Sequence, residues 1–295
     1  MKNILRQLER LKKLDLSDVE IQILDILAYD IRAATWETAA EAASSLDALC
    51  PRLEQRKEAE SYFYVTWDLM TDTATSFDVT KETQNHLTNI LLALQQCAKG
   101  ESNIWGNEAD RQPVWKDLPL FYVAVEASPG DPTQESTTES FTTKDAQEWR
   151  NINRFGALLL GSGVLGLHTQ AMDALRSALE EEPSSIPAVA ECRLRLACEW
   201  IRHSARSLLW WSQENIGYLE MPEYERDLTE EAISYQGVLY EGPPIMCRQR
   251  WEFWMVRLEW LAKSEDAGLG KEMRTKALEA FEIMMEVGEW IGHTL

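Results

Sequence analysis

Apolar residues recur every three to four positions along most of this 295-residue chain, and this helical period restricts the fold more than any other feature. Ser17-x-x-Glu20, a pattern typical of a helix start, opens a run in which Leu24, Leu27 and Ile31 share one face. The same period predicts helices over 33–49, 52–75, 80–98, 145–160, 167–182, 187–211, 249–262 and 270–291. We therefore expect an all-α fold: a single domain of about nine or ten packed helices, with two layers of antiparallel helical pairs as one arrangement.

Two segments depart from the helical pattern. Residues 118–125 are apolar and include two valines, so they are the best strand candidate, although no neighbouring segment suits them as a sheet partner. Residues 128–145 are rich in Ser, Thr, Pro and acidic side chains, so we predict a flexible loop there. The loop separates an N-terminal helical half, 1–127, from a Trp-rich C-terminal half, 146–295, and we expect both halves to form one continuous domain.

The net charge of the chain limits which kinds of molecule it is expected to bind. The chain carries 49 acidic and 29 basic residues, a net charge of −20 at pH 7. Nucleic acid is not an expected partner, because neutralising phosphates needs a basic surface. An acidic surface instead suits a basic protein partner. Nothing in the sequence indicates an oligomeric state.

The cysteines and the apolar segments indicate in which part of the cell the protein is expected. The five cysteines are odd in number and none forms C-x-x-C, so neither a disulfide framework nor a zinc site is expected. No apolar run is long enough to span a bilayer, and the first residues lack the apolar core of a signal peptide. These features predict a cytoplasmic or nuclear protein without a membrane span.

The segment GSGVLG, residues 161–166, satisfies the dinucleotide-binding pattern G-x-G-x-x-G. That motif needs a strand before it and a second strand ending in an acid about 20 residues later. Helix-forming residues precede it here, and a helix ending in glutamates follows it. We interpret it as a turn between two helices, in which the glycines allow positive φ and close packing, and we expect no cofactor.

Other catalytic signatures are weak. Glu82/His86, Glu199/His203 and Glu289/His293 have the spacing of ordinary i,i+4 pairs, not that of a metal motif, so we expect no metal. The acidic run Glu180–Glu182 is interpreted as a solvated helix end. No catalytic residue is assigned, and whether the protein is an enzyme is left open.

One predicted helix has a notable polar face. Beside the apolar stripe of residues 190–211 lie Arg195, Glu199, Arg202, His203 and Arg206. The face is either a ladder of surface ion pairs or a surface that contacts an anion.

Tryptophan is unusually abundant, with twelve residues in the chain. In the helix predicted over 249–262, Trp251 and Trp254 share one stripe and Trp260 lies on another, so this helix is expected to pack between neighbours. The tryptophans either fill the core or line a cavity, because an indole N–H needs a hydrogen-bond partner.

Four segments together resemble a fungal family known as domain of unknown function 3632. They are WKDLPLF at 115–121, WRNINRF at 149–155, ALRxALE at 174–180 and RWEFW at 250–254. The resemblance spans roughly residues 80–290 and implies an intracellular, helical, fungal protein. It transfers no catalytic residue, and its link to secondary-metabolite gene clusters is an association only.

Two functions are compatible with the sequence. The first is binding of an apolar small molecule in an aromatic-lined pocket, extending to cofactor-independent cyclisation or isomerisation in secondary metabolism. Its candidate ligand-binding residues are Asn151, Asn153, Arg154, Glu199, His203, Tyr235, Tyr240, Trp251 and Trp254. The alternative is a non-enzymatic interaction scaffold whose acidic surface binds a basic protein.

Overall fold

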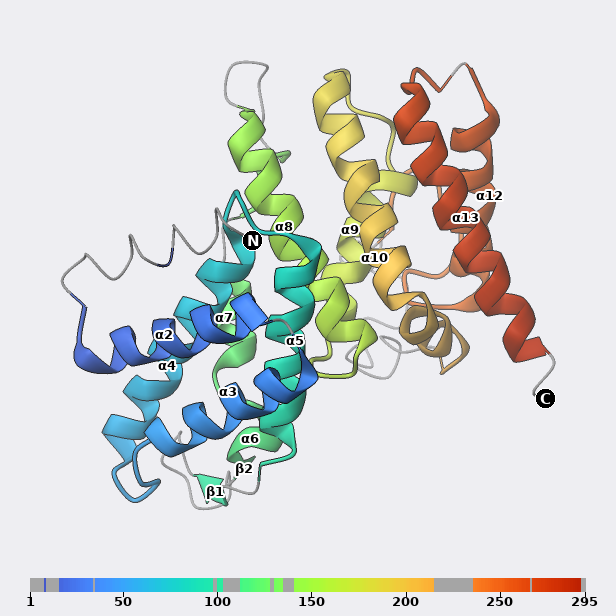
Figure 1. The fold of residues 1–295 in the computed structure, drawn as a ribbon. Coiled ribbons are helices and arrows are strands. Elements are labelled where there is room, and N and C mark those ends of the chain that lie inside the picture. Colours follow the sequence, from blue (N-terminus) through green and yellow to red (C-terminus); the bar gives the residue numbers. More distant parts are fainter. Residues whose placement is uncertain are drawn as a thin grey trace. The chain divides into compact units, whose positions relative to one another are not determined.

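The computed structural model describes residues 8, 16–33, 35–97, 100–102, 112–127, 130–134, 141–214, 236–265 and 267–292. Helices account for nearly all of the regular structure in these ranges, which confirms the predicted all-α class (Figure 1). The chain divides into two compact units. We call residues 1–130 and 147–155 the first unit, and residues 131–146 and 156–295 the second unit.

The described residues of the first unit form four long helices, two short helices and a pair of two-residue strands. The long helices are α2 (Asp18–Ala33), α3 (Trp36–Leu49), α4 (Arg56–Thr75) and α5 (Lys81–Gln95). The short elements are α6 (Val114–Asp117), α7 (Phe121–Glu126) and an antiparallel pair of two-residue strands, β1 (Glu101–Ser102) and β2 (Gln112–Pro113), in the register Glu101↔Pro113. Helix α2 packs against α3, α4 and α5, and α4 also packs against α7.

Side-chain caps fix where these helices begin. The Ser17 backbone N–H donates to the Glu20 carboxylate at 2.7 Å, and the Glu20 N–H donates to the Ser17 hydroxyl, so the predicted capping box is present. Thr35 and Thr38 form a second reciprocal pair at the start of α3. Thr80 caps α5 through the Thr83 N–H.

The strand candidate at 118–125 is not a strand. Leu118 and Leu120 have φ of 45° and 68°, and they form a turn around Pro119 from which α7 begins at Phe121. Phe121, Ala124 and Val125 are buried at helical spacing, so burial of this face outweighs the strand preference of the valines. The Trp67 indole N–H donates to the Pro119 carbonyl at 2.7 Å, which ties this turn to α4.

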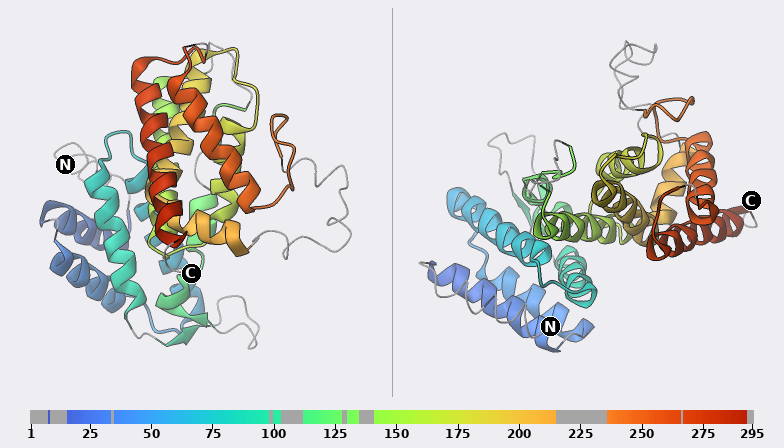
Figure 2. Two further views of the ribbon diagram at one scale, coloured as in Figure 1. Left: turned by 90° about the vertical axis from the view of Figure 1, so that its right-hand side faces the viewer. Right: turned by 90° about the horizontal axis from the view of Figure 1, so that it is seen from above.

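Helix α8 (Thr143–Gly161) belongs to both units. Its residues 147–155 lie in the first unit, and from residue 156 it begins the larger helical part of the second unit. That part continues with α9 (His168–Leu179), α10 (Pro187–Glu214), α12 (Arg248–Lys263) and α13 (Lys271–Gly292). Helix α10 packs against α9 and α13, and α12 packs against α13, α10 and α9, which closes a bundle of four helices (Figure 2).

The predicted loop at 128–145 remains a prediction. Residues 128–129 and 135–140 lie outside the described residues, as does Tyr235. Within the described part, Arg193 of α10 donates to both the hydroxyl and the carbonyl of Thr133, and Thr142 caps α8 through the Asp145 N–H.

Candidate functional site

A fully buried ion pair lies where α9 ends and α12 begins in the second unit. The Glu180 carboxylate accepts two hydrogen bonds from the Arg250 guanidinium, from Nε at 2.6 Å and from Nη2 at 2.9 Å. It also accepts one from the Trp254 indole at 2.7 Å and one from the Gly237 backbone N–H at 3.0 Å. Every partner is removed from water, so this carboxylate depends on all four donors. The expectation of a solvated Glu180 is therefore wrong.

Two aromatic rings flank the same arginine. The Arg250 Cζ lies 5.3 Å from the centre of the Tyr240 ring and 5.7 Å from that of Trp254. Burial raises the pKa of the Tyr240 phenol, whose oxygen lies 3.5 Å from the Cys247 sulfur. The structure thus brings Tyr240 and Trp254 together, and the indole N–H that needed a partner finds it in Glu180.

Asn151 and Arg154 belong to a different polar cluster, in the first unit. The Asn151 amide donates to the carbonyls of Thr75 and Ser76, and its oxygen accepts from Gln147 at 2.7 Å. The Gln84 amide donates to the carbonyls of Ala74 and Asn151. Arg154 Nε donates to the Gln84 side-chain oxygen at 2.5 Å. These bonds join the end of α4 to α5 and α8.

The other candidate residues have local contacts. Asn153 donates to the Trp149 carbonyl one turn earlier, and Trp251 is buried on α12. His203 Nε2 lies 3.3 Å from the Glu199 carboxylate, which confirms the predicted i,i+4 pair. That any of these residues contacts a ligand stays a prediction.

The polar face of α10 forms ion pairs with α13. Arg195 pairs with Glu272 at 2.9 Å, and Arg202 pairs with Glu279. Both partners advance by seven residues, so the two helices run in the same direction and the pairs repeat every two turns. These two arginines therefore take part in the ion-pair ladder that was one of the two interpretations.

The GSGVLG segment joins α8 to α9, as predicted. A Cβ at Gly161 would lie 1.8 Å from the His203 carbonyl oxygen, so the close approach to α10 requires glycine. Gly163 has a φ of 75°, in the left-handed region that favours glycine. Neither condition holds at Gly166, which lies outside that region and whose added Cβ would meet nothing within 4 Å.

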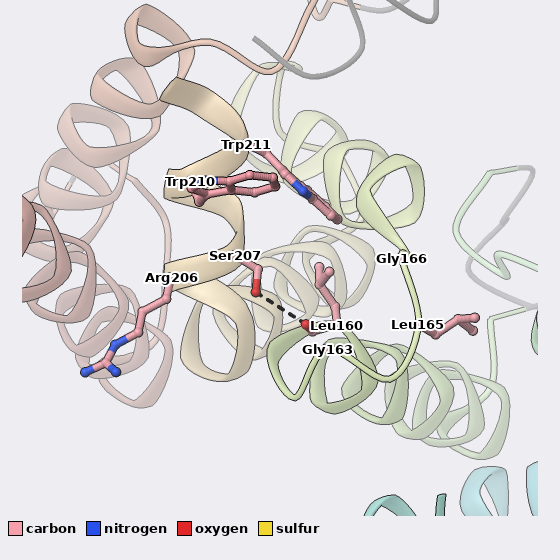
Figure 3. A pocket seen from close by; sticks show the side chains of 8 residues that line it. All are labelled: Leu160, Gly163, Leu165, Gly166, Arg206, Ser207, Trp210 and Trp211. Carbon is pink, nitrogen blue, oxygen red and sulfur yellow. Dashed lines mark hydrogen bonds between the residues drawn. The ribbon is translucent and has the colours of Figure 1, made fainter. Parts of the chain in front are cut away.

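An open pocket of about 400 Å³ lies between this turn and the last part of α10 (Figure 3). Arg206, Ser207, Trp210 and Trp211 line it from α10, and Leu160, Gly163, Leu165 and Gly166 line it from α8 and the turn. The Leu165 side chain extends away from α10, and the Arg206 guanidinium extends away from the turn. The turn therefore presents mostly backbone to the pocket.

Two indoles shape the α10 side of the pocket. Trp210 is 53% exposed, whereas Trp211 is buried and meets the His168 ring edge-on, with ring centres 4.8 Å apart. The Ser207 hydroxyl donates to the Leu160 carbonyl at 3.3 Å, which holds α10 against the end of α8.

The residues that line this pocket differ from those predicted from the sequence. None of the eight described candidate residues is among the residues that line this pocket. The available signal was Trp210, which falls off the apolar stripe of its helix and so was free to face a cavity or solvent.

A family model described as "Protein of unknown function (DUF3632)" matches residues 67–258, more than half of the chain. The chain belongs to the DUF3632 family. The matched span includes the turn at Pro119, the Asn151 cluster, the pocket and the Glu180–Arg250 pair. No curated protein and no solved structure matches this DUF3632 chain.

The described residues of this DUF3632 protein offer neither a membrane-spanning helix nor a metal-binding cluster. None of its described helices is long and apolar enough to cross a membrane. No group of three or more His, Cys, Asp or Glu side chains in the described ranges is placed to hold a metal ion.

Proposed function

We propose that the second unit binds an apolar small molecule in the pocket between α10 and the turn at residues 161–166. The observation that carries the proposal is a half-exposed indole, Trp210, beside a pocket of about 400 Å³. Exposing an indole to water is costly, and covering it with a ligand recovers that free energy. The volume lies within the range usual for small-molecule sites, roughly 300–1,000 Å³.

The chemistry of the lining favours binding over acid–base catalysis. Arg206 and Ser207 are the polar side chains among the described lining residues. Arginine stays protonated at physiological pH, and the Ser207 hydroxyl donates to a carbonyl and not to a base. Cyclisation or isomerisation would therefore have to proceed by shaping the substrate alone.

Titration with N-phenyl-1-naphthylamine, an apolar dye that fluoresces in apolar surroundings, tests this proposal. We expect saturable binding and a melting temperature that rises with dye concentration, because a ligand that prefers the folded state stabilises it. Trp210→Ala should weaken binding by about tenfold, roughly the loss expected for one aromatic contact.

Trp260→Ala is the matched control, because Trp260 is 43% exposed on α12 and does not line the pocket. It should bind the dye as the wild type does, with circular dichroism confirming that both variants are folded. Absence of saturable binding, or equal weakening by both substitutions, would contradict the proposal.

The second candidate function is an interaction scaffold, which the net charge of −20 favours. A fluorescent Lys/Arg-rich peptide should then bind with an affinity that falls as salt rises. Binding that is unaffected by salt, or no binding at low salt, would rule out this electrostatic mode.

A further inference from the structure

Gly166 is a glycine that the fold itself does not require. Its φ lies outside the left-handed region, and a Cβ built on it would meet no atom within 4 Å. Gly161 and Gly163, in the same turn, do have structural reasons: the first lies against the His203 carbonyl, and the second has a positive φ. The difference between Gly166 and its neighbours calls for another explanation.

The pocket supplies that explanation. Gly166 lines the pocket on the turn side, and Trp210 and Trp211 line it on the α10 side (Figure 3). Because Leu165 extends away from α10, the wall on the turn side is formed largely by backbone. A glycine in such a wall lets a ligand approach the peptide planes more closely than any other residue would.

We propose that Gly166 determines ligand specificity by admitting a planar aromatic ring, which lies between the backbone of this turn and the Trp210 indole. This inference rests on the proposed function and adds the class of ligand to it. An indole face is flat, so a flat ring contacts it over its whole area, whereas a globular molecule of equal carbon number contacts it only in part.

The test uses two ten-carbon alcohols of different shape, 2-naphthol and 1-adamantanol, measured by isothermal titration calorimetry. We expect 2-naphthol to bind the wild-type protein at least fivefold more tightly, on the order of the difference that one aromatic contact makes. Gly166→Ala should weaken 2-naphthol binding by a similar factor without lowering the melting temperature, because alanine fits this position in the unliganded protein.

Gly130→Ala is the matched control. Gly130 also has open space around an added Cβ and a φ outside the left-handed region, but it does not line the pocket, so its variant should bind 2-naphthol normally. Gly166→Ser serves as a second variant with the same expectation as Gly166→Ala.

The outcomes separate the two proposals. If 2-naphthol binds the wild type and both Gly166 variants equally, or if 1-adamantanol binds as tightly as 2-naphthol, the specificity inference fails and the pocket remains a binding site. If neither 2-naphthol nor N-phenyl-1-naphthylamine binds the wild type, both proposals fail. A protein that binds the dye but not 2-naphthol overturns the inference alone.

Discussion

The two units stabilise their helix junctions with opposite chemistry. In the first unit, neutral amides of Gln84 and Asn151 donate to backbone carbonyls, and the associated charge, Arg154, is only half-buried. In the second unit, Glu180 and Arg250 are both charged residues and both are fully buried. When one residue of a neutral network is replaced, the network loses only the hydrogen bonds of that residue. When the counter-ion of a buried ion is replaced, an unpaired charge stays buried, which costs much more free energy. The units should therefore differ in how they respond to a single substitution.

The largest effect is expected at the ion pair. Arg250→Met leaves the Glu180 carboxylate buried without its main partner, so the free energy of unfolding should fall by about 3–5 kcal/mol. The double variant Glu180→Gln/Arg250→Met removes the buried charge and retains an amide oxygen for Trp254, so it should be more stable than the single variant. Denaturant unfolding measures both.

Arg248→Met is the control for the ion pair, because Arg248 is exposed on the same helix and pairs with Glu252 at 3.1 Å. This surface pair should contribute less than about 1 kcal/mol. If Arg250→Met cost no more than Arg248→Met, the contrast between the units would disappear.

A smaller effect is expected in the first unit. Asn151→Ala removes the donors to the Thr75 and Ser76 carbonyls and leaves these acceptors buried. The free energy of unfolding should therefore fall by about 1–3 kcal/mol. Asn153→Ala removes one bond to the Trp149 carbonyl within the same helix and should cost less. Equal costs for the two variants, measured by thermal unfolding, would mean that the buried network does not stabilise this unit.

The helices were predictable because their signals are local. Period, caps and breakers lie within a few residues of each other, and the capping box at Ser17–Glu20 formed as expected. The strand candidate at 118–125 could not be resolved from the sequence because the deciding contacts are distant: the Pro119 carbonyl accepts a hydrogen bond from Trp67, 52 residues away. A preference of valine for strands does not contain that information.

The polar sites were less predictable for the same reason. From the sequence alone, Glu180 resembles an exposed acid at a helix end. Only the fold shows that Arg250 and Trp254, which lie 70 and 74 residues later in the chain, contact it. The tryptophans at 251 and 254 were recognised as unusual, but whether they face a core or a cavity depends on neighbours that the sequence does not specify. The pocket could not be predicted because only the fold brings Arg206, Ser207, Trp210 and Trp211 of α10 beside the glycine turn.

Asp30 adds a test of the comparison, because it is a fully buried acid in the unit whose Gln84–Asn151 junction is held by neutral amides. Its carboxylate accepts from Thr38 at 2.9 Å, and burial raises its pKa despite that bond and the attraction of His86. A pKa that is higher in the folded state means that the folded protein binds more protons, so the contribution of Asp30 to stability falls as pH rises through this pKa. At neutral pH the ionised group therefore destabilises the fold.

Asp30→Asn should consequently be more stable than the wild type at pH 7, and the difference should shrink as the pH falls through the raised pKa of Asp30, where the wild-type carboxyl is also neutral. Chemical denaturation at a series of pH values measures the difference directly, and comparing variant with wild type cancels the titration of the groups that do not interact with Asp30. Asp25→Asn, at an exposed position on α2, controls for the change in helix charge. A difference that is independent of pH, or a variant less stable at pH 7, would show that the Thr38 bond and His86 compensate fully for burial.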